Sequence, residues 1–475
     1  MTRWRLTGPM SFTLPALLIA HVSAWAGNSV LEQAWQGVVA QSPEYAAARA
    51  RRDAGAAASA AARALWMPTI GAEGGIGRRS VDSVSSGAQF SAPGFGTTND
   101  VDFRTSVNDG NAHQWGVVLQ QPLLDAGRVA DAAALRSRAR MAEAQFRLTE
   151  QSLMVRTAEA LAAVVEADAR FAATRRQHEA AQRERDQAQA RFESGDLPVT
   201  EWREAQAQLD ALAINELDAQ QALAVATAAY ADLTGLAAPA AAREPLPPPS
   251  TGNADPVIGD AGAPLEQWLR RANESSPALT LQYEALAQAQ AESRRWSRLD
   301  GFRLDLVGRY GRESISGRGD FGAADINNRG GSIGIQATVP LFSGGMRAAQ
   351  RRSAESGERA AQADLDAARQ QTLLRTRTAW LGVESARARV RAQERALASA
   401  VLRLDATRVG FESGDRTLLD VMAAEGSALQ AAADGVRARC EGLVATLRLS
   451  AAAGSLTAQS LEAADGGDFA CGVRE

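Results

Sequence analysis

The stretch RFESGDLPVTEWREAQAQL, residues 191–209, has a partner in GFESGDRTLLDVMAA, residues 410–424. Both copies open with a nearly identical hexapeptide, and two further pairs of segments recur in the same order. QQPLLDAGR at 120–128 matches TVPLFSGGMR at 338–347, and LEQAWQGVVAQSPEY at 31–45 matches LEQWLRRANESSPAL at 265–279. Self-similarity in a fixed order is the signature of an internal repeat. The chain is therefore predicted to be a tandem duplication.

The duplication divides the chain of 475 residues into segments. The first structural repeat is placed at 27–236 and the second at 265–454. A proline-rich stretch at 237–264 contains PLPPPS and is typical of an extended linker rather than a packed element. The remaining residues, 455–475, are expected to form a C-terminal tail.

Each hexapeptide lies where a very long helical stretch stops. Residues 128–193 and 347–412 contain no proline and are dominated by Ala, Arg, Gln, Glu and Leu, which favour helices. About 65 residues at 1.5 Å per residue would make a rod of roughly 100 Å. Gly195 and Gly414 supply the residue that a helix C-terminus prefers, and a second helix should follow each turn. The sequence thus predicts two helical hairpins, at about 128–236 and 347–454.

The second rod carries a heptad pattern, in which apolar residues recur seven positions apart. This spacing predicts a coiled-coil seam. Its members are Val383, Val390, Leu397, Leu404 and Phe411.

Four strands are expected before the rods, two in each repeat. Apolar and polar residues alternate in them, as in RLDLVGRY at 303–310, which gives each strand one apolar face. The strands are placed at about 69–80, 111–122, 302–312 and 330–340. The Gly-, Ser-, Asn- and Asp-rich segments between them, about 80–111 and 313–329, are expected to be solvated loops. Pro122 and Pro340 are expected to end the second strand of each pair, and Pro43 and Pro277 to open a short helix ahead of each pair.

The first 26 residues, 1–26, read as an export signal. Arg3 and Arg5 precede an apolar run, and SAWA at 23–26 ends in small residues. The alternative is a retained membrane anchor, although the apolar run is shorter than the ~20 residues that span a bilayer. No cysteine stands at the expected new N-terminus, Gly27, so lipid attachment there has no acceptor.

Composition excludes several classes of function. The net charge is −4, and removal of the signal makes it more negative, which argues against a nucleic-acid partner. His113 and His178 lie far apart, and no cluster has metal-ligand spacing. No catalytic triad or phosphate-binding loop occurs either, so neither an enzyme, nor a metal site, nor a bound cofactor is expected. Cys440 and Cys471 either pair in an oxidising compartment or remain free thiols.

Four amphipathic strands cannot close a pore in lipid, because an open sheet edge is not tolerated there. Bacterial barrels have eight or more strands, so several copies must share one barrel, and three copies would supply twelve strands. Trp115, Tyr310 and Phe342 near the strand ends suit an aromatic girdle, or are ordinary strand aromatics. The other class to weigh is a periplasmic coiled-coil protein without a pore, against which the alternating strands argue.

On the two hexapeptide stretches and the repeated order of elements, the chain resembles the TolC family of outer membrane channel-tunnels. The resemblance implies a homotrimer in the outer membrane. Its fold would be a twelve-stranded β-barrel with four strands per protomer, continued by a helical α-barrel across the periplasm. An inner-membrane pump, an ABC transporter or another type, would dock through a periplasmic adaptor, the membrane fusion protein.

The resemblance also implies roles for residues near the two turns. Thr200 and Glu201 match the Thr-Asp pair of the first turn, and Arg416 matches the arginine that bonds to that pair across protomers. Asp420 matches the first of two acidic residues that ring the constriction. Several positions depart from the pattern. Phe411 replaces a tyrosine, Ala423 replaces the second acidic residue, and Glu201 is one methylene longer than the family's aspartate. Residues 299–301 also lack a Leu-Pro pair. The turn residues themselves are expected to contact the adaptor; they are Gly195, Asp196, Gly414 and Asp415.

The predicted function is a passive export duct. Lipid-anchored relatives are common among channels that serve efflux only, so the missing acceptor cysteine favours type I secretion of a protein, with a glycine-rich repeat (RTX-type) toxin as the expected cargo. The alternative is the outer membrane component of a small-molecule efflux pump.

Overall fold

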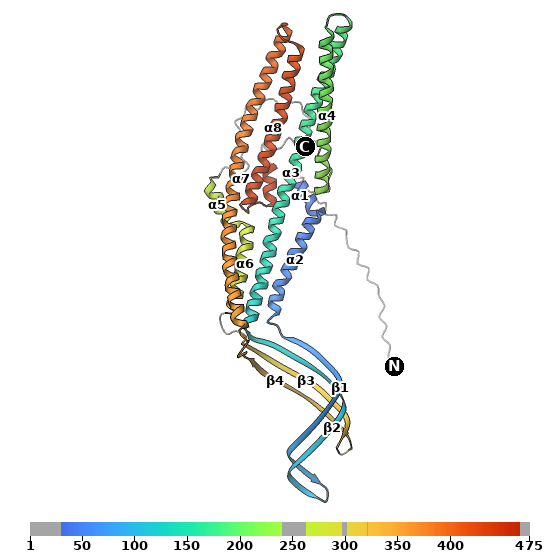
Figure 1. Ribbon diagram of the computed structural model, residues 1–475, viewed down its shortest axis with the longest axis vertical. Helices are drawn as coiled ribbons and strands as arrows, with labels where there is room; N and C mark the ends of the chain where they lie inside the picture. The colour runs from blue at the N-terminus through green and yellow to red at the C-terminus, as the bar shows by residue number, and fades with distance from the viewer. Residues whose placement is uncertain (1–29, 240–262, 297–301, 321, 466–475) are drawn as a thin grey trace, which may run out of the picture.

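The computed structural model describes residues 30–239, 263–296, 302–320 and 322–465. Helices occupy one part of the long molecule and a four-stranded sheet the other (Figure 1). The expected signal at 1–26 and most of the expected linker lie outside the described residues. Among the described helices, none combines the length and the apolar character needed to cross a bilayer.

The described part of each repeat starts with two short helices, followed by two strands and a long helical hairpin. Ser42 and Ser276 precede the prolines that open the second short helix of each repeat, and the Ser42 hydroxyl accepts a hydrogen bond from the Tyr45 amide. A further helix occupies part of the expected tail. The helices are α1 (Val30–Gln41), α2 (Pro43–Ala64), α3 (Ala126–Glu193), α4 (Val199–Thr234), α5 (Leu265–Ser275), α6 (Pro277–Arg295), α7 (Met346–Glu412), α8 (Leu418–Ala452) and α9 (Ala458–Asp465).

The strands form one antiparallel sheet in the order β1-β2-β3-β4, with β1 and β4 at its edges. All four are longer than the sequence predicted, so the expected loops at about 80–111 and 313–329 are wrong. Those residues mostly extend the two hairpins, because main-chain hydrogen bonds between strands form with any type of side chain. The strands are β1 (Thr69–Ala92), β2 (Gly96–Asp125), β3 (Arg303–Gly319) and β4 (Gly322–Thr338).

Pro122 was expected to end its strand, and this prediction is also wrong. β2 continues to Asp125, with a register shift between Pro122 and Leu124 that accommodates the missing N–H. β4 ends at Thr338, two residues before Pro340.

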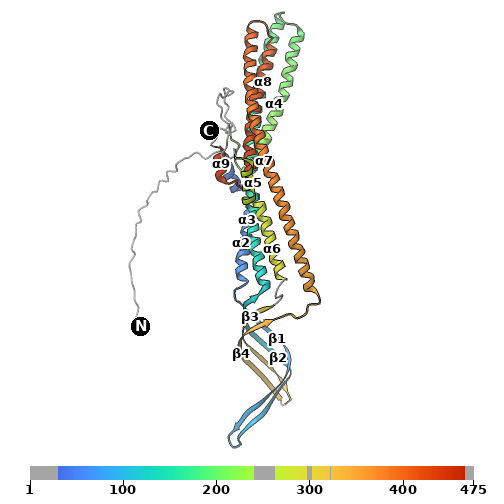
Figure 2. The ribbon, with the colours of Figure 1, turned by 90° about the vertical axis from the view of Figure 1, so that its left-hand side faces the viewer.

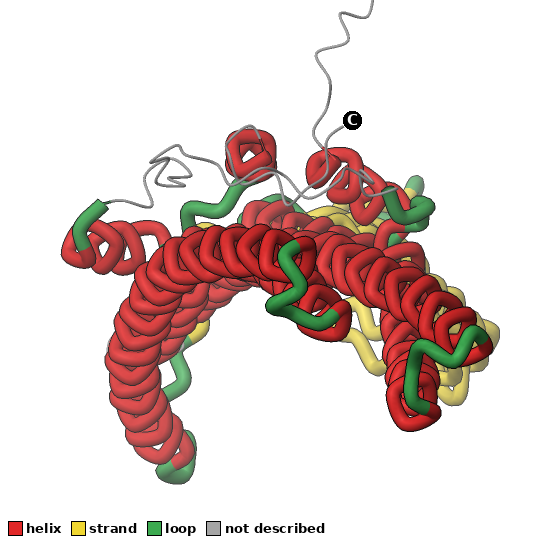
Figure 3. Tube along the Cα trace, turned by 90° about the horizontal axis from the view of Figure 1, so that it is seen from above, coloured by secondary structure: helices red, strands yellow, loops and turns green. Residues whose placement is uncertain are grey.

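The long helices pair as predicted, α3 with α4 and α7 with α8, and α3 also packs along α8 (Figure 2). Seen along the long axis, the helices follow an arc (Figure 3). Val383, Val390 and Leu404 are 3%, 3% and 9% exposed, so three of the five residues of the predicted α7 seam are buried, whereas Leu397 is only partly buried. Phe411, at the end of that seam, is 42% exposed.

The largest apolar core lies midway along the helices, where α1, α3, α4, α8 and α9 meet. Leu31, Leu153, Tyr230 and Leu461 are almost fully buried in it. Cys440 is in the same core and is disulfide-bonded, whereas Cys471 lies outside the described residues. This core ties both repeats together and leaves the hairpin ends to extend beyond it.

Candidate functional site

The candidate site is formed by the turns of the two long hairpins. Both turns lie at the end of the molecule farthest from the sheet (Figure 1). The structure thus brings to one end all of the residues that the sequence singled out: Gly195, Asp196, Thr200, Glu201, Phe411, Gly414, Asp415, Arg416 and Asp420.

The first turn closes α3 with a Schellman motif. Gly195 has φ +83°, a conformation that side chains disfavour. Its N–H donates to the Phe192 carbonyl at 3.0 Å, and the Asp196 N–H donates to the Arg191 carbonyl at 2.8 Å. The Ser194 hydroxyl adds a bond to the Asp196 carboxylate at 2.8 Å.

The second turn has the same geometry. Gly414 has φ +83°, and the Asp415 N–H donates to the Gly410 carbonyl at 2.8 Å. The Ser413 hydroxyl donates to the Asp415 carboxylate at 3.2 Å. The shared letters Phe-Glu-Ser-Gly-Asp therefore encode one helix-ending motif, with the serine and aspartate securing the glycine turn.

The helices that follow begin in different ways. Pro198 precedes α4, whose start has no side-chain cap. An aromatic contact closes this hairpin instead: the rings of Phe192 and Trp202 stack at 5.6 Å with an interplanar angle of 8°. The Arg203 guanidinium lies 4.4 Å from the Trp202 ring centroid. Trp202 was not predicted from the sequence as a residue of this site, although it lies in the first turn of the helix that follows Gly195.

A capping box starts α8. The Thr417 hydroxyl accepts a bond from the Asp420 N–H at 3.2 Å, and the Asp420 carboxylate accepts bonds from the Thr417 N–H and hydroxyl, each at 2.9 Å. These bonds hold the pKa of Asp420 below its usual value. The Thr-x-x-Asp spacing could have identified Thr417 from the sequence.

Arg416 is placed by its neighbour Gly410. The Arg416 N–H donates to the Gly410 carbonyl at 3.1 Å. A Cβ atom at position 410 would lie only 2.8 Å from Arg416 Cγ, so the glycine makes room for the arginine stem. Within the described residues of one chain, no ion pair joins Arg416 to Glu201, and Thr200, Glu201 and Arg416 are all exposed.

The two hairpins are joined to each other through α3 and α8. The Gln177 amide donates to the Gly426 carbonyl at 2.9 Å. Farther from the turns, Arg437 lies 3.4 Å from Glu166, and Arg448 lies 2.6 Å from Glu159. These polar contacts span the boundary between the two repeats below the turns, so moving one hairpin against the other must break them.

Among the residues that the structure describes, no three His, Cys, Asp or Glu side chains gather as metal ligands. His178 and Glu216 form a pair at 2.5 Å across the first hairpin. The turns thus offer exposed charges and hydrogen-bonding groups on rigid helix ends, which suits contact with other protein chains.

Known proteins resemble the chain over most of its length. It is 26% identical over 465 residues to the outer membrane protein TolC of Escherichia coli, covering 95% of this chain and 88% of that one. It is 28% identical over 423 residues to the alkaline protease secretion protein AprF of Pseudomonas aeruginosa, covering 88% and 83%. The solved outer membrane protein VceC of Vibrio cholerae shares the fold, with a TM-score of 0.66 at 19% identity over 89% of this chain and 96% of that one.

The protein family described as outer membrane efflux protein matches residues 35–236 and 268–455. The match covers both repeats, including the sheet, the long hairpins and the two turns. The expected fold class is confirmed: long helical hairpins with four strands per chain, of the kind that serves a barrel shared among subunits. The chain belongs to the outer membrane efflux protein family, whose members include TolC.

Proposed function

We propose that three copies of this chain assemble into one export duct, with a twelve-stranded barrel in the outer membrane and an entrance at the hairpin turns. The observation that carries this proposal is that the single chain has unsatisfied contact surfaces on both of its sides. A sheet edge and an apolar helix stripe are open on each side.

The sheet supplies the first pair of open flanks. β1 and β4 are its two edges, and among the described residues each pairs with one strand only. β1 leads away from the helices and β4 returns to them, so β4 beside the β1 of a neighbouring copy is an antiparallel pair. An unpaired edge cannot remain in hydrocarbon, and closure by three copies removes every edge.

The helices supply the second pair. Four exposed apolar residues follow one line along α7 at multiples of seven: Leu374, Leu381, Leu402 and Val409, which are 55–70% exposed. This stripe is separate from the buried seam that packs on α8. On α4, at the other flank, Ile214, Leu217 and Val225 are 61–64% exposed. A heptad stripe of this kind is stable only against a partner helix, and α4 of the next copy is the partner that closes a ring.

The trimer is tested by substituting one residue of the α7 stripe. Leu402→Glu would bury a charge in the proposed seam, and we expect it to reduce the detergent-extracted trimer to monomer in light scattering. Arg403→Glu, one residue along and off the stripe, serves as the control. A Leu402→Glu protein that remains trimeric would refute the α7–α4 interface.

We propose further that the closed entrance is latched by Glu201 of one protomer and Arg416 of the next. Both are exposed at the turns, and exposed pairs contribute only about 0–1 kcal/mol each, which suits a latch that docking can release. Arg416→Glu is expected to raise trimer conductance in planar bilayers, whereas Arg403→Glu leaves it unchanged. Unchanged conductance in the Arg416→Glu trimer would rule out the latch.

We propose that the duct serves type I secretion, with an ABC transporter and an adaptor at the hairpin turns and an RTX-type protein as cargo. In support, two of the similar proteins are named as protease secretion proteins, AprF and PrtF. The second candidate is drug efflux, favoured by a 32% identical stretch of 130 residues in the efflux protein BepC. Deleting the gene separates the two. If the duct serves secretion, an exported protein is lost from the culture medium and drug susceptibility is unchanged. If it serves efflux, the exported proteins are unchanged and drug susceptibility rises.

A further inference from the structure

We propose that Leu341 and Phe342 of one protomer insert into an apolar hollow of the next protomer, at the level where the sheet meets the helices. The occupant of the hollow is thus a second copy of this chain. The inference rests on the proposed trimer and adds a specific contact to it.

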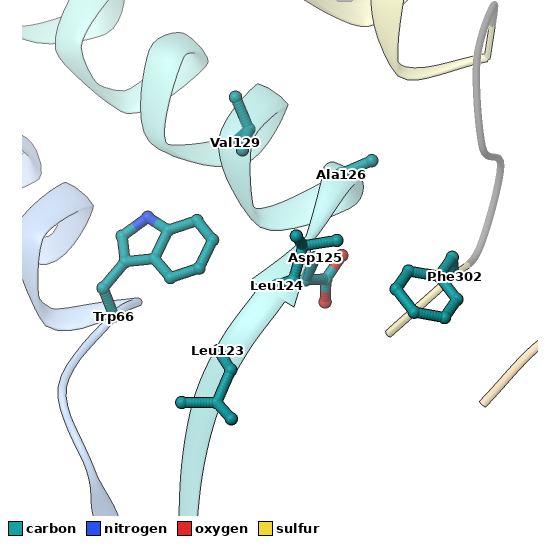
Figure 4. Close-up of a pocket in the computed structure, with 7 residues that line it drawn as sticks. All are labelled: Trp66, Leu123, Leu124, Asp125, Ala126, Val129 and Phe302. Carbon is teal, nitrogen blue, oxygen red and sulfur yellow. The ribbon is translucent and has the colours of Figure 1, made fainter. Parts of the chain in front are cut away.

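The hollow lies at the junction of α2, β2 and α3. It has a volume of about 390 Å³, which is within the ~300–1,000 Å³ range of sites that bury small ligands. Leu123, Leu124 and Val129 contribute to its wall and are 45%, 47% and 59% exposed. Trp66 faces them from the end of α2, and Phe302 lies on the other side of Leu124 (Figure 4). These apolar side chains are uncovered in the single chain and could be buried by an apolar segment of a neighbouring copy.

The inserting segment follows β4. Leu341 and Phe342 are 93% and 89% exposed, more than any other large apolar side chains in the described residues. They lie between the end of β4 at Thr338 and the start of α7 at Met346. Within the part of the chain that the structure describes, no element covers them, although the segment is held at both ends by regular structure.

The sheet topology brings the segment and the hollow together. Trp66 lies three residues before β1 starts at Thr69, and Leu341 lies three residues after β4 ends at Thr338. Both strand ends are at the helical side of the sheet. When β4 of one copy pairs with β1 of the next, the two strands are ~4.8 Å apart. The residues that follow β4 therefore arrive beside those that precede the neighbour's β1.

The chemistry of the hollow favours a protein segment over lipid. Asp125 lines it, and its carboxylate lies 3.4 Å from Arg128 and 3.6 Å from Arg303. Ionised groups are costly beside acyl chains. A short chain segment brings two apolar side chains for the wall and main-chain amides for the polar rim.

Photocrosslinking tests the contact in the full-length protein in detergent. With Phe342 replaced by p-benzoylphenylalanine, we expect ultraviolet light to join protomers, with adducts mapped by mass spectrometry to Trp66, Leu123 or Val129. Phe95, which is 86% exposed at the β1–β2 turn, is the matched control and should join none of these. A trimer whose adducts fall elsewhere, or on lipid alone, overturns this inference and leaves the proposed function intact. Absence of the trimer overturns both.

Single substitutions by aspartate on either side of the contact give a second test, which is read from the stability of the trimer. Phe342→Asp and Val129→Asp should each lower the temperature at which the trimer dissociates into monomers on denaturing gels, whereas Phe95→Asp should not. Equal dissociation temperatures for all three variants and the wild type would overturn the contact.

Discussion

Removing the Thr417 hydroxyl should loosen the start of α8 without affecting the rest of the hairpin. Thr417→Ala deletes one acceptor, for the Asp420 N–H at 3.2 Å, and one donor, to the Asp420 carboxylate at 2.9 Å. Substituting an N-cap threonine by alanine costs about 0.5–2 kcal/mol. Because the cap is exposed, we expect about 1 kcal/mol, which corresponds to roughly fivefold in an opening equilibrium.

Hydrogen exchange measured by mass spectrometry is the direct assay. Amides in the first turns of α8 should exchange about fivefold faster in Thr417→Ala, and amides in the buried middle of α8 should be unchanged. Thr200→Ala is the control, because Thr200 lies at the matching start of α4, where no side-chain cap forms. Equal exchange in Thr417→Ala and the wild type would show that the capping box contributes nothing, and the reasoning would fail.

Four further outcomes are expected. The pKa of Asp420 is lowered, so its bonds to Thr417 stabilise the fold above the ordinary pKa of an aspartate and are lost as pH falls through the lowered pKa; the exchange difference of Thr417→Ala should shrink in acid. Gly414→Ala should cost about 1–2 kcal/mol, because alanine at φ +83° is strained, whereas Gly357→Ala within α7 should be neutral or stabilising in thermal unfolding. Trp202→Ala should speed exchange at the first turn only, through loss of a stacked pair that contributes about 0.5–1.5 kcal/mol beyond its buried area. Maleimide should label no cysteine in the denatured, unreduced protein, because Cys440 is disulfide-bonded.

The helical part of the fold could be predicted from the sequence because local rules determine it. A run without proline, a heptad of apolar residues and a terminal glycine are each sufficient to place part of a long hairpin. The predicted rod at 347–412 differs from α7 (Met346–Glu412) by one residue at its start.

The lengths of the strands were underestimated because the hairpins of a barrel do not depend on an apolar core. Residues 80–111 look like a loop by composition, yet Val81 pairs with Val107 and Ser85 with Phe103. The main-chain hydrogen-bond partners of these residues lie in the other strand of the hairpin. The pattern of side chains along one strand does not predict this pairing. Pro122 was misjudged for a related reason, since a register shift allows a strand to continue past a proline.

At the candidate site, the position of Asp420 was predicted, whereas its bonds to Thr417 were missed even though the Thr-x-x-Asp spacing is typical of a capping box. Placing Asp420 near a turn required only the repeat. Its bonds to Thr417 depend on side-chain geometry at one helix start, and the first copy lacks them because Pro198 stands where Thr417 does in the second.

This difference between the copies gives the two turns different local contacts. Duplication preserved the helix-ending motif, which any hairpin needs, and left the residues after it free to diverge. The first turn is closed by Phe192 and Trp202, an apolar clasp that is insensitive to salt and pH. The second is closed by Thr417 and Asp420, beside an arginine that Gly410 allows to fold back over the helix end. Polar contacts weaken with salt and acid, so the second hairpin is the one that we expect docking or pH to move.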